Sequence, residues 1–159
     1  MKGAGIAGLA TMALLALSGP AKAQVSAGGY FVRTSDPYGE SDGVGLRLEA
    51  GAPLLPVSLA LNGEYFFPDC GGSDCSLRGL TIDANYSLVV PLVQPFVGVG
   101  WSVRQSKVDG ETSTKRGLNI GVGVAVTLRR VRPFADVRYR PSKIFSGHPY
   151  AVRLGVMIR

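Results

Sequence analysis

From residue 24 onward, apolar and polar side chains alternate along stretches of about ten residues. In residues 117–127, Leu118, Ile120 and Val122 occupy alternate positions, with glycine or asparagine between them. A repeat of two places alternate side chains on opposite faces of a β-strand. The alternation therefore predicts an all-β fold with eight strands, at residues 25–33, 43–50, 57–67, 77–88, 93–104, 117–127, 132–140 and 150–159.

The connectors between these predicted strands alternate in length. The first, third, fifth and seventh are long and polar, whereas the second, fourth and sixth are short. Membrane barrels have short turns on one side of the membrane and longer loops on the other. The pattern predicts an eight-stranded antiparallel up-and-down transmembrane β-barrel with short periplasmic turns and longer extracellular loops.

The first 23 residues have the pattern of a secretion signal. Lys2 precedes an apolar run over residues 3–17, and Ala21-Lys22-Ala23 forms a small-x-small cleavage site. The alternative is a membrane anchor, but the run is shorter than the ~20 residues that a helical span needs. We expect cleavage after Ala23, a barrel domain over 24–159, and a location in the outer membrane of a Gram-negative bacterium.

The only two cysteines, Cys70 and Cys75, flank a Gly-Gly turn in the third connector. In an exported protein this arrangement predicts a local disulfide. The alternative is part of a metal site, but the chain has no second cysteine pair and only one histidine. We therefore expect no metal and no cofactor.

The face of small residues also carries charged side chains of both signs, and arginine without lysine at its mid-strand positions. Charges enclosed in a barrel must be paired, and the forked arginine side chain suits that task. We therefore expect the small, charged face to line the lumen and the apolar face to meet lipid. The alternative is a soluble barrel with its charged face in water. The lumen charges expected are Arg47, Glu49, Glu64, Asp83, Arg104, Asp136, Arg138, Arg140 and Arg153.

Aromatic residues on the apolar face fall near the ends of the predicted strands. Membrane barrels carry such residues at both membrane interfaces. The interface aromatics expected are Tyr65, Phe67, Trp101, Tyr139 and Tyr150 toward the long connectors, and Tyr86 toward the short turns.

Three segments, at residues 94–100, 117–123 and 132–139, together with the secretion signal, resemble the small outer-membrane β-barrel family of OmpA-type domains, OmpX-type proteins and opacity proteins. The resemblance covers the whole chain after residue 23 and implies the barrel fold and its location. It also implies the barrel-assembly machinery as a partner. These barrels usually end on an aromatic residue that the machinery recognises, whereas this chain ends on Arg159.

The charge balance excludes one class of partner. Two lysines lie in the signal, so its removal lowers the formal net charge from +6 to +4. No basic run with interleaved aromatics occurs, so no nucleic-acid partner is expected. The expected partners are membrane lipid and lipopolysaccharide, whose phosphates could meet Lys107, Lys115, Arg116 and Lys143. A closed barrel satisfies its hydrogen bonds within one chain, so a monomer is sufficient.

Three functions remain open. The first is a non-enzymatic structural or surface-interaction role carried by extracellular loops on a rigid scaffold, with the lumen plugged by Arg–carboxylate pairs. The second is a lipid-modifying enzyme (an acyl hydrolase or transferase), for which the lone His148 and the nearby Ser142 and Ser146 are the candidates. The third is a narrow channel for small solutes, against which the lumen charges argue. We expect the first, with no catalytic residues.

Overall fold

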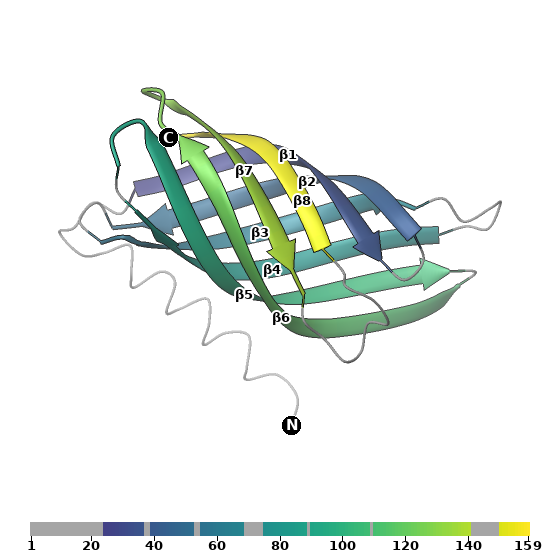
Figure 1. Cartoon of the computed structure of the whole chain (residues 1–159). Helices are drawn as coiled ribbons and strands as arrows, with labels where there is room; N and C mark the ends of the chain where they lie inside the picture. Colours follow the sequence, from purple (N-terminus) through teal and green to yellow (C-terminus); the bar gives the residue numbers. More distant parts are fainter. Residues whose placement is uncertain are drawn as a thin grey trace.

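The computed structural model describes residues 24–36, 39–52, 55–68, 75–88, 90–108, 110–140 and 150–159, which form a closed barrel of eight antiparallel strands (Figure 1). The predicted fold class is therefore confirmed. The strands follow one another around the barrel in chain order and are β1 (Gln24–Asp36), β2 (Gly39–Gly51), β3 (Val57–Phe67), β4 (Cys75–Ser87), β5 (Val93–Val108), β6 (Glu111–Val126), β7 (Val131–Tyr139) and β8 (Tyr150–Ile158).

The barrel closes between its first and last strands. The register of β1 on β8 runs from Ala27 opposite Ile158 to Thr34 opposite Ala151. Closure gives each strand a hydrogen-bonded neighbour on both sides, which is what a β-structure requires in a medium without water. No helix in the described part of the chain is long and apolar enough to cross a membrane.

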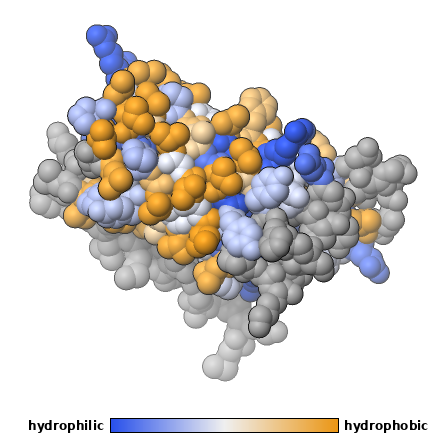
Figure 2. Space-filling model, viewed as in Figure 1, coloured by the Kyte–Doolittle hydropathy of each residue, from blue (hydrophilic) through white to orange (hydrophobic). Residues whose placement is uncertain are grey.

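The barrel turns its apolar face outward. Leu46 is 73% exposed, whereas its chain neighbour Arg47 is 2% exposed, and the same alternation runs along the other strands. Apolar side chains consequently cover much of the outer surface (Figure 2). A water-soluble barrel has the opposite arrangement, so the structure has the orientation of faces found in membrane barrels.

Two of the predicted long connectors are mostly strand. β1 and β2 extend until only residues 37–38 separate them, and β5 and β6 extend until only residues 109–110 separate them. The prediction of long loops at these two places was wrong. Residues 105–116 lack the alternation of apolar and polar side chains that predicts a strand. Backbone hydrogen bonds between β5 and β6 nevertheless pair them as strands. Gly110, with a φ of 88°, allows the tight reversal at the end of the β5–β6 hairpin.

Residues 141–149 of the connector between β7 and β8 lie outside the described residues, as do residues 69–74 of the connector between β3 and β4. Residues 1–23 lie outside them too, so the secretion signal stays a prediction. At the opposite end of the barrel the turns are short, as expected. For example, the amide of Val131 donates to the carbonyl of Leu128 across the β6–β7 turn.

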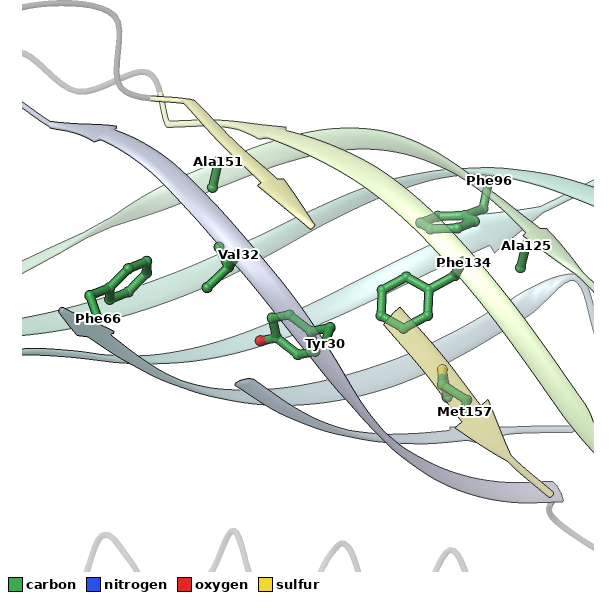
Figure 3. Packing of buried hydrophobic residues seen from close by; sticks show 8 residues of the cluster. All are labelled: Tyr30, Val32, Phe66, Phe96, Ala125, Phe134, Ala151 and Met157. Carbon is green, nitrogen blue, oxygen red and sulfur yellow. The ribbon is translucent and has the colours of Figure 1, made fainter. Parts of the chain in front are cut away.

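Part of the lumen is packed with apolar side chains (Figure 3). The rings of Tyr30 and Phe134 meet edge to face, with centroids 6.0 Å apart. Phe66 is fully buried. The remaining members of this cluster are Val32, Phe96, Ala125, Ala151 and Met157. Eight strands enclose an interior just wide enough for side chains to fill, and these residues fill it together with charged groups.

Candidate functional site

All nine charged side chains that the sequence suggested for the lumen are buried in it. Alternation along the strands points them inward, and the barrel brings together residues far apart in sequence. The carboxylates come from β2, β3, β4 and β7. The arginines come from β2, β5, β7, β8 and the residue after β7. Several ion pairs cross the interior, such as Arg47 with Asp136 and Arg153 with Glu64. Others run along one strand, such as Arg47 with Glu49.

The first group of charges surrounds Glu49 at the short-turn end of the barrel. Its carboxylate accepts from Arg47 and Arg132, each at 2.8 Å, and from the hydroxyl of Ser58 at 3.1 Å. Arg47 also donates to Asp136 of β7, at 3.2 Å. Its guanidinium lies 5.0 Å from the centre of the Phe134 ring, so it is held by both charge and an aromatic face.

The second group lies further along the lumen and joins Asp83, Asp136, Arg138 and Arg153. Arg138 lies 3.4 Å from Asp83 and 3.6 Å from Asp136, and it donates to the side-chain carbonyl of Asn85 at 2.8 Å. Arg153 lies 3.5 Å from Asp83. Both arginines are fully buried, so each charge depends on these partners in place of water.

The third group surrounds Glu64 toward the other end of the lumen. Arg153 approaches it at 2.7 Å and Arg140 at 3.5 Å, and the hydroxyl of Tyr30 donates to it at 3.3 Å. Arg104 lies nearby, donates to Thr34 at 3.1 Å and covers the Phe66 ring at 4.8 Å. Arg153 therefore links this group to the second one.

Several residues of the network were missed by the sequence reasoning. Arg132 binds Glu49, and Asn62 donates to Asp83 at 2.9 Å. The signal for Arg132 was present, because it shares the alternation of Asp136 and Arg138 on the same strand. The buried amides and hydroxyls gave no such signal, since they also suit a solvated strand; they are Thr34, Asn62, Thr81, Asn85, Ser102 and Asn119.

This arrangement places ion pairs and aromatic rings in the interior of the barrel. Ion pairs from opposite walls join across it in three successive groups, and aromatic rings fill spaces between them. Within the described residues, no three His, Cys, Asp or Glu side chains are grouped so as to hold a metal ion.

The six aromatic residues expected at the membrane interfaces all point outward and are between 38% and 60% exposed. Tyr65 and Phe67 pack edge to face at 5.3 Å near the end of β3. Trp101 differs from the expectation in one respect. Because β5 continues to Val108, this side chain lies in the middle of the strand rather than toward its end.

Outside the lumen, the most unusual feature is the β5–β6 hairpin, which extends past the ends of β7 and β8 (Figure 1). β6 pairs with β5 along its whole length, from Glu111 to Val126. Its pairing with β7 begins only at Ile120, opposite Tyr139. Among the described residues, positions 111–119 of β6 therefore have a neighbouring strand on one side only.

The cations around this end of the barrel fall into two kinds. On β1 and β2, Arg33 donates to Asp42 through two nitrogens, at 2.7 and 2.9 Å. The hydrogen bond from Arg33 holds the pKa of the Asp42 carboxyl below its ordinary value. On β4, β5 and β6, Arg78, Lys107 and Arg116 point outward, and no carboxylate of the described residues forms an ion pair with them.

Some predicted residues lie outside the described part of the chain. Cys70 is one of them, so its pairing with Cys75, the first residue of β4, stays a prediction. Lys143 and the three candidates for catalysis, Ser142, Ser146 and His148, also lie outside it.

Taken together, the closed barrel, the apolar outer face and the buried charges of the lumen define the fold of a small eight-stranded outer-membrane β-barrel. Among solved structures, the chain is similar to Neisserial surface protein A (TM-score 0.60, 20% identity, covering 84% of this chain and 94% of that one). It is also similar to Ail, the attachment invasion locus protein of Yersinia pestis, in complex with the heparin analogue sucrose octasulfate (0.58, 14%, 86% and 96%).

A third similar structure is the outer membrane enzyme PagL (TM-score 0.51, 10% identity, covering 84% of this chain and 98% of that one). No protein-family model and no curated protein sequence matches the chain. At these identities the likeness establishes the fold. Because the similar structures include both a surface protein and an enzyme, the fold alone leaves the activity open.

Proposed function

We propose that this chain is a non-enzymatic protein of the Gram-negative outer membrane that binds a partner outside the cell through its protruding β5–β6 hairpin. The observation that carries this proposal is the edge of β6 over residues 111–119, which among the described residues has a strand, β5, on one side only. An exposed strand edge offers backbone donors and acceptors to an extended segment of another protein, which can add to the sheet as a further strand.

The rest of the barrel supports this proposal as a scaffold. The outward apolar side chains suit a lipid environment, and the buried ion pairs hold the strands around a filled interior. Binding residues are commonly displayed at the ends of such a rigid framework. The filled lumen also argues against a channel for small solutes.

Membrane insertion is tested by gel mobility. A folded membrane barrel resists detergent and changes its mobility only after boiling, so we expect a heat-dependent shift in protein purified from the membrane fraction. Recovery in the soluble periplasmic fraction, without a shift, would contradict the membrane location.

The binding role is tested by shortening the hairpin. Ser106 and Ser113 are opposite each other, so residues 107–112 can be replaced by a two-residue Asn-Gly turn without altering the register below. We expect the wild-type chain to confer adhesion to host-cell or matrix-protein surfaces, and this variant, which lacks the hairpin tip and the first two residues of the β6 edge, to weaken that adhesion. The matched control replaces residues 35–40 in the same way, between Thr34 and Ser41, and should retain adhesion.

Equal adhesion of the wild type, both variants and cells without the protein would refute the binding role. The enzymatic alternative is tested separately, by mass spectrometry of lipid A from cells with the wild-type chain, with His148→Ala and with neither. Unchanged lipid A is expected in all three, and a change that depends on His148 would establish catalysis instead.

A further inference from the structure

The outer wall formed by β4, β5 and β6 changes in character along its length. The register aligns its outward side chains in rows across the three strands. One row holds Ile82, Trp101 and Leu118, and the next holds Leu80, Val103 and Arg116. The row after that holds Arg78, Gln105 and Thr114, and the last holds Ser76, Lys107 and Thr112. The wall thus passes from apolar to cationic within a few residues.

The apolar part of this wall contains a groove with a volume of about 670 Å³. Its floor is formed by two rows of outward valines and an isoleucine on β5 and β6, and by the small side chain of Ala84 on β4. Tyr86 and Tyr139 stand at its borders. The groove is lined by apolar groups and lies on the lipid-facing side, so a hydrocarbon chain is the group that suits it.

The cationic part of the wall lies at a suitable distance from this groove. Val99 borders the groove, and Val103, which is opposite Arg116, follows four residues later, or about 13 Å along the strand. Trp101 stands between them on the same outward face of β5. The groove and the cations are therefore spaced like the acyl chain and the headgroup of one lipid.

The chemistry of the cationic part favours phosphate. Arg78 and Arg116 present forked donors, Lys107 adds a third positive charge, and the threonines of β6 supply hydroxyl groups beside them. The Tyr65 ring lies 5.7 Å from the Arg78 guanidinium and helps to orient it. Arg78 and Arg116 are separated by two strand spacings across the sheet and by two residues along the strands. Their Cα atoms are therefore roughly 12 Å apart. That spacing suits a headgroup with more than one phosphate better than a single small anion.

We propose that the β4–β6 wall binds one multiply phosphorylated lipid of the outer leaflet, such as the lipid A part of lipopolysaccharide. Its phosphates lie on Arg78, Lys107 and Arg116, and an acyl chain lies in the groove between Tyr86 and Tyr139. This inference rests on the proposed location in the outer membrane and is independent of the partner that the β6 edge binds.

The test uses Trp101, the only tryptophan of the chain, as its reporter. In vesicles of phosphatidylcholine with brominated acyl chains, the full-length barrel has its Trp101 fluorescence quenched. Diphosphorylated lipid A with unbrominated chains should restore the fluorescence by displacing brominated chains from the groove. Dephosphorylated lipid A and phosphatidylglycerol should restore much less at the same mole fraction.

The variants locate the site. The double variant Arg78→Gln/Arg116→Gln should need at least about fivefold more lipid A for half-recovery, because each cation near a membrane surface contributes about a fivefold preference. Its matched control is Arg129→Gln/Arg130→Gln, which removes two exposed arginines at the opposite end of the barrel and should leave recovery unchanged. Ala84→Phe should weaken recovery by filling the groove, whereas Leu46→Phe on β2 should not.

The proposal is overturned if dephosphorylated lipid A or phosphatidylglycerol restores fluorescence equally well, or if the two double variants behave alike. Competition by millimolar inorganic phosphate would overturn it in favour of a small-anion site. A chain that shows the heat-dependent gel shift and the hairpin-dependent adhesion but no recovery would overturn this site and leave the proposed function standing.

Discussion

Arg153 of β8 and Glu64 of β3 form an ion pair across the lumen, with 2.7 Å between Nη2 and Oε1 and both side chains fully buried. Their strands are not neighbours in the sheet, so the pair connects opposite walls of the barrel. The same arginine reaches Asp83 on β4, and one residue therefore joins three strands.

Removing one member of this pair should be costly, because the other charge stays buried without its partner. We expect Glu64→Ala to lower the free energy of unfolding by about 3–5 kcal/mol. The exposed pair of Arg33 and Asp42 supplies the control, and Asp42→Asn should cost far less, because water screens that pair. Urea-induced unfolding in lipid vesicles measures both, and equal losses would contradict a structural role for the lumen network.

The seam between β1 and β8 should be sensitive to one added methyl group. A Cβ atom at Gly28 would lie 2.7 Å from the Cα of Met157 and closer still to the backbone oxygen of Val156. Backbone atoms cannot move aside cheaply, so Gly28→Ala should destabilise the barrel by about 1–3 kcal/mol. At Gly63 nothing lies within 4 Å of such an atom, and Gly63→Ala is the matched control. The same unfolding measurement should separate the two variants.

The filled lumen should not conduct ions. In planar bilayers the wild-type barrel is expected to give no discrete current steps, because three groups of ion pairs and aromatic rings occupy its interior. Regular steps at the single-molecule level, retained after removal of contaminating porins, would instead favour the channel.

The exposed pair of Arg33 and Asp42 should respond to acid. Because the pKa of the Asp42 carboxyl is lowered by its partner, the ion pair is complete above the ordinary pKa and is lost as the pH falls through the lowered one. An NMR titration of the Asp42 carboxyl should therefore show a midpoint below that of an unpaired aspartate. Arg33→Gln should return the midpoint toward the ordinary value, and an unchanged midpoint would contradict the pairing.

The predicted disulfide should join Cys70 and Cys75 and matter little for the fold. Its closed loop is so short that reduction should cost about 2 kcal/mol or less. Mass spectrometry after alkylation without reduction should find both cysteines unmodified. Full alkylation would show that the bond is absent.

The fold was largely predictable because the period of two is strong in the parts of the strands that face lipid. Leu118, Ile120 and Val122 must all point outward, and the charged positions between neighbouring apolar residues must then point inward. The alternation put the nine lumen charges on one face, and their mixed signs together with the small residues beside them placed that face inside. The partners of each charge could not be predicted from the sequence. Arg153 and Glu64, for example, are brought together only by the curvature and shear of the closed barrel.

The protruding hairpin was the part that the sequence did not indicate. Thr112, Ser113 and Thr114 are exposed on both faces, so no apolar alternation marks them as strand. The β-branched threonines weakly favour a strand, but the polar residues around them favour a loop. The one-sided edge of β6 among the described residues could not be predicted either, since it depends on the pairing of β7 with β6 starting only at Tyr139, opposite Ile120.

The pairing of β1 with β8 also constrains how the chain can fold. The two strands that close the barrel are the most distant in sequence, so their pairing carries the largest loop-closure cost of any in the barrel. Any intermediate that lacks this contact exposes two rows of unsatisfied amides and carbonyls, which hydrocarbon does not tolerate. Insertion and closure should therefore proceed together, and a chain that lacks either terminal strand should not persist in the bilayer as a partial barrel.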